Sequence, residues 1–203
     1  MSDEDDEGRG LGEIIATNIR PWNGFWSWKD KPIGELGAAR EILAAAGIDA
    51  LDLMSRGKDD PPDCECNIGG RRTAVEVTEL VHEPTLKRSL KALKQRASGT
   101  KPNRPEAHFV WQQADLIRAL QERIDQKDRV KLKGGPYERY ILVITTDEMF
   151  LDASQVEKWL SSAIFQADRI SDVCLGLAYE PESKRCPVFK LHAISRNNTL
   201  AGS

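Results

Sequence analysis

Apolar positions along the chain follow two spacings, one typical of helices and the other typical of strands. Over residues 34–47 they recur every three to four positions, which predicts an amphipathic helix that stops at Gly47. Over residues 63–80 they alternate on both sides of a Gly-Gly pair, which predicts a strand, a turn and a second strand. Two further helices are expected over residues 84–98 and from about residue 108 to 130.

The C-terminal part of the chain predicts one more strand, one helix and a closing hairpin. The apolar run within residues 137–147 is bounded by turns, as is typical of a buried strand in the centre of a sheet. Residues 152–167 predict a helix with Asp or Ser as its N-cap, and residues 172–180 and 186–194 predict a hairpin. This order of elements predicts an α/β domain with a mixed central sheet flanked by helices.

A chain of 203 residues is long enough for a single domain with a full core, which we expect over residues 13–196. The acidic residues near the start make residues 1–12 a candidate disordered tail, and residues 197–203 a disordered C-terminus. The N-terminus has neither a basic leader nor an apolar core, so export is not expected. The longest apolar runs, such as residues 141–144, are far too short to span a bilayer.

The cysteines indicate a cytoplasmic protein with reduced thiols. They lack the C-x-x-C spacing of a structural zinc site and the density of a disulfide framework. The Cys-x-Cys pair shares one face of its predicted strand with Ile68, which favours packing in the core over metal binding with His82 or His108. The four cysteines are Cys64, Cys66, Cys174 and Cys186.

The charge is unevenly distributed along the chain. The formal net charge is -3, yet residues 84–140 contain 14 Lys and Arg against six Asp and Glu, a local excess of +8. Such an excess can attract a polyphosphate to one surface, although solvated helix faces explain it equally well. The candidate residues for nucleic-acid binding lie on the basic helix: Lys87, Arg88, Lys91 and Lys94.

The Gly-Gly pair places two acidic residues opposite each other in the predicted hairpin. If Gly69 and Gly70 form a two-residue hairpin turn, facing residue numbers sum to 139, so Asp63 faces Glu76. Alternation then places the carboxylates on one face and the apolar side chains on the other. Like charges at about 5 Å destabilise a hairpin, which suggests a positive group between them.

Mg²⁺ or Mn²⁺ is the cation that this arrangement favours. Mg²⁺ prefers carboxylate and water oxygens and is commonly held by one or two carboxylates and a phosphate. The backbone carbonyl of Val77 is close enough to Glu76 to contribute, and Thr78 shares the face of Glu76. The alternative is an exposed hairpin edge on which Arg71 and Arg72 neutralise the acids.

The sequence "PPD" at residues 61–63, followed by a hairpin and "AVEVTEL" at residues 74–80, resembles the PD-(D/E)XK nuclease superfamily. The resemblance implies a restriction-endonuclease-like fold in which Asp63 and Glu76 are the metal-binding carboxylates. It also implies an acidic residue on the first helix, for which Glu35 is the candidate and Glu41 the substitute.

The chain departs from this pattern at Thr78, which stands where the superfamily has its lysine. Threonine cannot supply a cation to stabilise the charge that develops at phosphorus. Some members carry the lysine, or a glutamine, on a neighbouring helix. The predicted helix over residues 108–130 offers Lys127 and Gln113, about 21 Å apart, so one metal centre cannot use both. We select Lys127 and keep Gln113 as the substitute; the alternative for Lys127 is a surface lysine that reaches water.

Three functions are consistent with these observations, and the first two belong to different classes. The first is a metal-dependent phosphodiesterase that cuts nucleic acid, DNA in preference to RNA, with residues 84–98 holding backbone phosphates without reading bases. The second is a nuclease-fold protein that has lost catalysis and binds nucleic acid or assembles with other subunits. A third is a regulatory protein unrelated to nucleases, in which the carboxylate pair is incidental. No membrane partner is expected, and a homodimer is one arrangement that the sequence leaves open.

Overall fold

The computed structural model describes residues 30–57, 61–98, 109–148 and 150–196 of the chain. The two segments predicted to be disordered, residues 1–12 and 197–203, lie outside the described residues.

The chain divides into two compact units. One contains Val81–Val110 together with Met1–Gly24, and the other contains Phe25–Leu80 and Trp111–Ser203. The smaller unit contributes helix α3 (Glu83–Ala97), at the place where the basic helix is predicted. Whether residues 13–196 form one domain stays a prediction.

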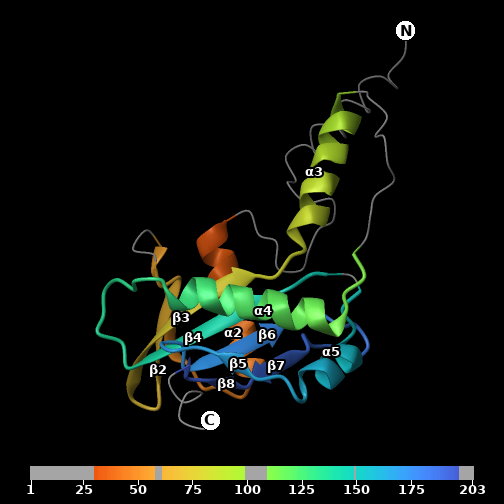
Figure 1. The fold of residues 1–203 in the computed structure, drawn as a ribbon. Coiled ribbons are helices and arrows are strands. Elements are labelled where there is room, and N and C mark those ends of the chain that lie inside the picture. Colours follow the sequence, from red (N-terminus) through yellow and green to blue (C-terminus); the bar gives the residue numbers. More distant parts are fainter. Residues whose placement is uncertain (1–29, 58–60, 99–108, 149, 197–203) are drawn as a thin grey trace. The chain divides into compact units, whose positions relative to one another are not determined.

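The larger unit is built on a six-stranded sheet with the strand order β1-β2-β3-β4-β6-β7 (Figure 1). Strands β3, β4 and β6 run parallel to one another, whereas β1 with β2, β2 with β3 and β6 with β7 are antiparallel. The predicted mixed sheet and the central position of the strand within residues 137–147 are thus confirmed. The strands are β1 (Leu51–Ser55), β2 (Cys64–Ile68), β3 (Arg71–Glu79), β4 (Arg139–Thr145), β6 (Asp172–Gly176) and β7 (Val188–Leu191).

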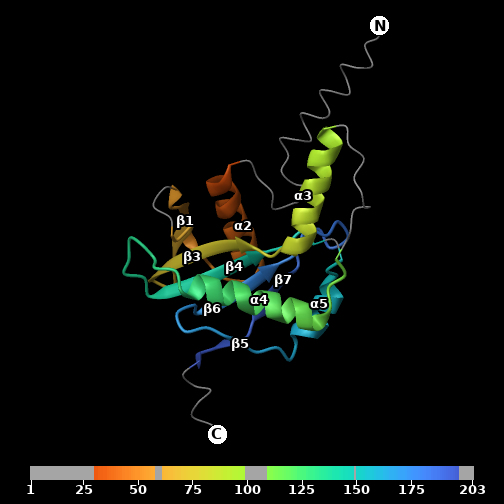
Figure 2. The same cartoon turned by 45° about the horizontal axis from the view of Figure 1, so that its top comes forward.

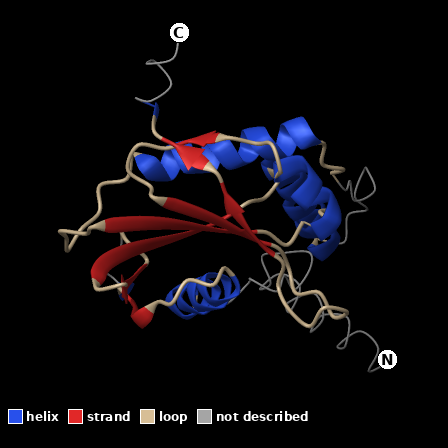
Figure 3. Cartoon of the chain, turned by 90° about the horizontal axis from the view of Figure 1, so that it is seen from below, coloured by secondary structure: helices blue, strands red, loops and turns tan. Residues whose placement is uncertain are grey.

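Helices cover both faces of this sheet. Helix α2 (Lys31–Ala45) lies on one face, and α4 (Gln113–Asp128) lies on the other (Figures 2 and 3). A small second sheet, β5 (Phe165–Gln166) paired with β8 (Ala193–Ile194), lies on the side of α4. The larger unit is therefore α/β, with a mixed central sheet flanked by helices, as the sequence predicts.

The face under α2 carries one apolar core. Helix α2 begins after its N-cap Asp30, whose side chain accepts the N–H of Ile33, and the chain leaves it through Gly47 at a φ of +66°. The small residues of α2 and Ile42 pack against the strands. Side chains share one face about every 3.6 residues in a helix and every 2 residues in a strand. The fully buried members are Ala39, Ile42, Leu43, Cys64, Val75, Ile141, Val143 and Cys174.

The hairpin register is the predicted one. Cys64 pairs with Val75 and Glu65 pairs with Ala74, so facing numbers sum to 139. The turn works because Gly69 and Gly70 adopt φ values of +59° and +79°, which other residues rarely reach. The four cysteines are free and buried, so the prediction that the Cys-x-Cys pair packs in the core is confirmed.

Several element boundaries differ from the prediction. Helix α4 begins at Gln113 instead of near residue 108, because Gln112 has an extended backbone. Helix α5 (Ala153–Leu160) ends well before residue 167, because Phe165 and Gln166 pair with β8 as strand β5. This long-range pairing overrides the local helical spacing.

Strand β1 is absent from the prediction. It lies at the edge of the sheet, and its residues Leu51 and Met54 are more than half exposed. An edge strand with outward apolar residues has no clean alternation to detect.

The buried face of α4 ends on a charged residue. Its buried residues are Leu116, Leu120, Ile124 and Asp128, whereas Gln113 is exposed and Lys131 lies beyond the helix end. Asp128 replaces an apolar residue there because its carboxylate accepts three backbone N–H groups, from Asp168, Arg169 and Ile170.

None of the helices in the described part of the chain has the length and apolar character needed to cross a membrane.

Candidate functional site

The position of Asp63 is set by the end of the β2 to β3 ladder. In the observed register, the residue opposite Val77 is Pro62, which has no N–H to give to a neighbouring strand. Beyond the pair Cys64 with Val75, the N–H of Val77 donates to a side chain: Oδ2 of Asp63 accepts it at 2.7 Å, and Asp63 is only 4% exposed. Asp63 stays attached to the sheet through its carbonyl, which accepts the N–H of Arg56 at 2.8 Å.

The carbonyl of Val77 lies at the same edge of β3. In a strand, the N–H and C=O of one residue point to the same neighbour. Because the N–H of Val77 points to Asp63, its carbonyl oxygen points to the same side, where Pro62 cannot donate to it. The predicted contribution of Val77 therefore agrees with the direction of its backbone.

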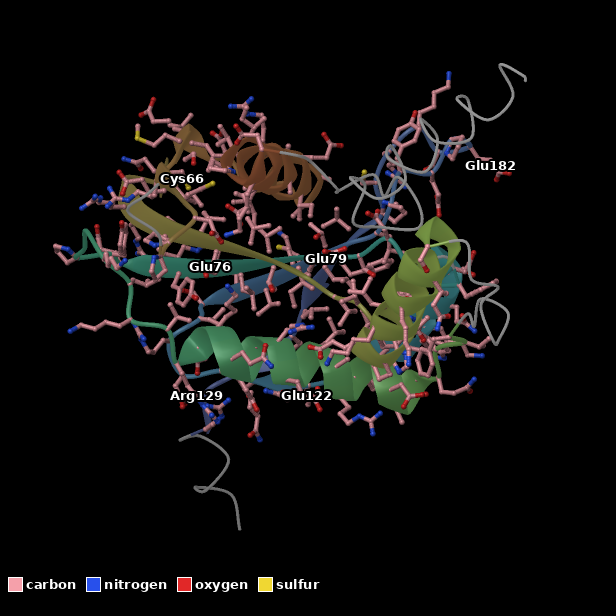
Figure 4. The ribbon with its side chains drawn as sticks, turned by 90° about the horizontal axis from the view of Figure 1, so that it is seen from above. Cys66, Glu76, Glu79, Glu122, Arg129 and Glu182 are labelled. Carbon is pink, nitrogen blue, oxygen red and sulfur yellow. The ribbon has the colours of Figure 1, made fainter. Side chains whose placement is uncertain are left out.

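Glu76 and Lys127 meet across the layer between the sheet and α4. Glu76 alternates with the core residues Val75 and Val77, so its side chain leaves the opposite face of β3. The Nζ atom of Lys127 lies 2.6 Å from Oε1 of Glu76, whose side chain is 3% exposed. In Figure 4, Glu76 lies in the layer between α2 and α4, while Cys66 lies on the side of α2.

Helical spacing and a hydrogen bond place Lys127. It follows the buried Ile124 by three residues, so it projects from nearly the same face of α4 one turn later. The hydroxyl of Tyr140 on β4 donates to the carbonyl of Lys127 at 3.0 Å, which fixes the last turn of the helix on the sheet. With 25% of its side chain exposed, the lysine reaches from solvent to the buried carboxylate.

Glu35 reaches the site from the first turns of α2. Lys31 lies one turn before it, with its Nζ 2.8 Å from Oε1 of Glu35 and 3.7 Å from Oδ1 of Asp63. The pKa of the Glu35 carboxyl is raised to about 7: burial is the largest cause, Lys31 lowers the pKa, and the nearby Asp63 adds to the rise. The substitute Glu41 is exposed and contributes to the raised pKa of Cys186, away from this site.

The contacts join the predicted residues in two groups: Asp63 with Val77 and, through Lys31, with Glu35, and Glu76 with Lys127. The cations that pair with these acids differ from the expected arginines. Arg72 does not neutralise Asp63 or Glu76: its Nη2 lies 2.9 Å from Glu65, and its guanidinium stacks on Tyr137 at 4.9 Å. Lys31 and Lys127 are the cations beside the central acids. Sequence reasoning missed Lys31, although its spacing of four residues before Glu35 at a helix start is a usable signal.

The substitute Gln113 and Thr78, the residue at the lysine position of the motif, have other contacts. The side chain of Gln113 donates to the carbonyl of Trp159 at 3.2 Å, near α5, and does not share the end of α4 that carries Lys127. The carbonyl of Thr78 accepts the hydroxyl of Thr145 at 3.5 Å. Neither residue supplies a cation.

The side chains of Asp63 and Glu76 are the candidate ligands for Mg²⁺ or Mn²⁺. Within the described ranges, no cluster of three or more His, Cys, Asp or Glu side chains is arranged to hold a metal ion. A metal here would be held by the carboxylates of Asp63 and Glu76 and the carbonyl of Val77, with water or phosphate oxygens completing the sphere. Glu35 would act beside this set, through its contact with Asp63.

The predicted nucleic-acid-binding residues belong to the smaller unit. Lys87 lies 3.2 Å from Glu83 on the exposed surface of α3, and Lys91 is exposed. The side chains of Arg88 and Lys94 lie outside the described set. Their role in binding stays a prediction.

Comparison of the chain with protein-family models, with curated proteins and with solved structures finds no match.

Proposed function

We propose that this protein is a metal-dependent nuclease that hydrolyses phosphodiester bonds, in DNA more readily than in RNA. The observation that carries the proposal is the ion pair between Lys127 and the buried Glu76, 2.6 Å long, in a chain whose other motif carboxylate, Asp63, is also buried. The pair puts a lysine in contact with one motif carboxylate, in a chain whose motif has Thr78 where the superfamily has its lysine.

Each residue would have a separate task. Asp63 and Glu76 would hold Mg²⁺ or Mn²⁺, with the carbonyl of Val77 as a third oxygen donor. The bound metal would supply Lewis acidity and lower the pKa of a water molecule. Lys127 would donate from Nζ to the oxygens on which negative charge develops, because its amine is already fixed beside Glu76.

The burial of the two carboxylates favours this chemistry. Asp63 and Glu76 are 4% and 3% exposed, so their charges are poorly screened by water. The bond from the Val77 N–H fixes one Asp63 oxygen and thereby orients the other. Rigid strands therefore hold both carboxylates before any ligand arrives, which is the preorganisation that hydrolytic catalysis needs.

A second function is favoured by one observation: position 78, where the nuclease motif has its lysine, is a threonine. If the ion pair of Lys127 with Glu76 is purely structural, the protein is a nuclease-fold subunit that binds nucleic acid or assembles without cutting. The proposal for either function includes a cytoplasmic location, which the four free cysteines support, and leaves room for a homodimer.

The test is direct. Purified protein is incubated with labelled single- and double-stranded DNA and RNA in Mg²⁺, in Mn²⁺ and in EDTA, next to the Asp63→Asn protein. Cleavage that requires the divalent cation and Asp63 supports the nuclease. Binding without cleavage of any substrate supports the subunit.

A further inference from the structure

The exposed lysine at the start of α2 faces two buried acids. Lys31 is the first residue of the helix, and its amine lies 2.8 Å from Glu35 and 3.7 Å from Asp63. Its side chain is 70% exposed, whereas the side chains of Glu35 and Asp63 are 15% and 3% exposed. The ammonium group therefore covers the acids from the solvent side.

The two lysines of the site differ in how they are held. Lys127 is 25% exposed and projects from the last turn of α4, which Tyr140 fixes to the sheet. Lys31 is 70% exposed, and its ammonium group ends a flexible four-carbon stem. A cation that approaches Asp63 from solvent meets Lys31 first.

A divalent cation and an ammonium group cannot both stay close to one Asp63 oxygen. Like charges about 4 Å apart repel strongly when the site is partly buried. Asp63 Oδ2 is engaged by the Val77 N–H, and Oδ1 is the atom that lies next to Lys31.

We propose that Lys31 is a built-in counter-ion that a divalent cation displaces. It stabilises the metal-free protein and lowers the affinity of the site for metal. This inference rests on the proposed function in one respect, that Asp63 holds the metal. It assigns Lys31 a positioning role that the nuclease-like motif does not contain.

The test measures Mn²⁺ affinity by titration calorimetry at pH 8 on protein stripped with EDTA and dialysed. Lys31→Met should raise the affinity about threefold to tenfold, the effect of removing one partly screened charge. Lys31→Glu should raise it further, and Lys31→Arg should leave it within about twofold of the wild type.

The matched control is Lys87→Met. Lys87 is also an exposed lysine four residues from a glutamate, at 3.2 Å from Glu83 and 77% exposed, but it lies on α3 in the other unit. Its loss should not change Mn²⁺ affinity. A second readout is thermal unfolding in EDTA, in which Lys31→Met should unfold at a lower temperature than wild type and saturating Mn²⁺ should close the gap.

The outcomes separate this inference from the proposed function. Equal or weaker Mn²⁺ binding by Lys31→Met, in a wild type that binds Mn²⁺ and cuts DNA, overturns the counter-ion role and leaves the nuclease intact. The expected ranking of affinities in a protein that cuts nothing supports the counter-ion role and rejects the nuclease. Lack of Mn²⁺ binding by every variant rejects both.

Discussion

The amine of Lys127 lies 2.6 Å from the carboxylate of Glu76, although 51 residues separate the two in the chain. One residue is in the last turn of a helix and the other is in the middle of a strand on the sheet below it. This contact gives the site a cation that its sequence motif lacks.

Replacement of Lys127 tests its catalytic role. Lys127→Ala should lower Mg²⁺-dependent cleavage by a factor on the order of 10² to 10³, because one fixed charge-stabilising group is lost. Circular dichroism should show an unchanged fold. Gln113→Ala and Lys131→Ala are the controls and should keep wild-type rates, since Gln113 contacts Trp159 and Lys131 is exposed beyond α4. Full activity of Lys127→Ala would show that its ion pair is only structural.

Asp63→Asn should act on metal affinity without unfolding the protein. The amide oxygen of asparagine can still accept the Val77 N–H, so the β3 edge remains satisfied. Mn²⁺ affinity, measured by calorimetry, should fall about tenfold or more because a charged ligand is lost. Excess Mg²⁺ should restore part of the cleavage. Glu41→Gln, on an exposed face of α2, should bind Mn²⁺ like wild type, and an unchanged affinity of Asp63→Asn would remove Asp63 from the metal site.

The raised pKa of Glu35 predicts that the stability of the protein depends on pH. Its pKa is about 7 in the folded protein against 4.5 as its ordinary value, with burial as the main cause, so the folded state keeps a proton that the unfolded chain releases. Its contribution to the free energy of unfolding is therefore full below about pH 4.5 and is lost as the pH rises to about 7. Denaturant unfolding in EDTA from pH 4 to 8 should show wild type losing stability relative to Glu35→Gln over this window. A constant difference between the two proteins would contradict the placement of Glu35.

The basic helix α3 predicts salt-dependent binding of nucleic acid. Reversal of charge at Lys87, Lys91 and Lys94 should weaken binding to labelled DNA for all sequences alike and flatten its dependence on salt, because fewer phosphates are neutralised. Fluorescence anisotropy at several salt concentrations measures both effects. A protein with three exposed lysines reversed in the larger unit is the control for net charge: Lys158, Lys184 and Lys190. Equal loss of binding in both proteins would mean that α3 is not a specific contact surface.

Replacement of Asp128 should cause a large loss of stability. Its carboxylate accepts the backbone N–H groups of Asp168, Arg169 and Ile170 at 2.8 to 3.1 Å and is 4% exposed. Asp128→Ala should lower the free energy of unfolding by about 2 to 4 kcal/mol, because buried donors lose their acceptor. Asp115→Ala removes an exposed pair with Arg118 and should cost about 0.5 kcal/mol or less. Denaturant titration followed by circular dichroism measures both, and similar small losses would show that water replaces the carboxylate.

The sequence by itself determined the hairpin that carries the site. Only glycine reaches the positive φ of both turn positions easily, and this fixed the register that sets Asp63 near Glu76 and turns Cys64 and Cys66 into the core. The amphipathic helix before Gly47 and the buried strand around Ile141 were likewise readable, because local spacing alone distinguishes a helical period from a strand.

Only the tertiary structure decided which cations accompany the acids. Lys127 and Gln113 are equivalent in a helical pattern, and the choice between them depends on which end of α4 crosses β3. Lys31 meets Asp63 only because α2 packs on the same sheet. The helix predicted over residues 152–167 ends at Leu160, and Phe165 and Gln166 form a strand because β8 supplies their pairing partner. These contacts join residues far apart in the chain, so they depend on how whole elements pack, and local periodicity carries no information about them.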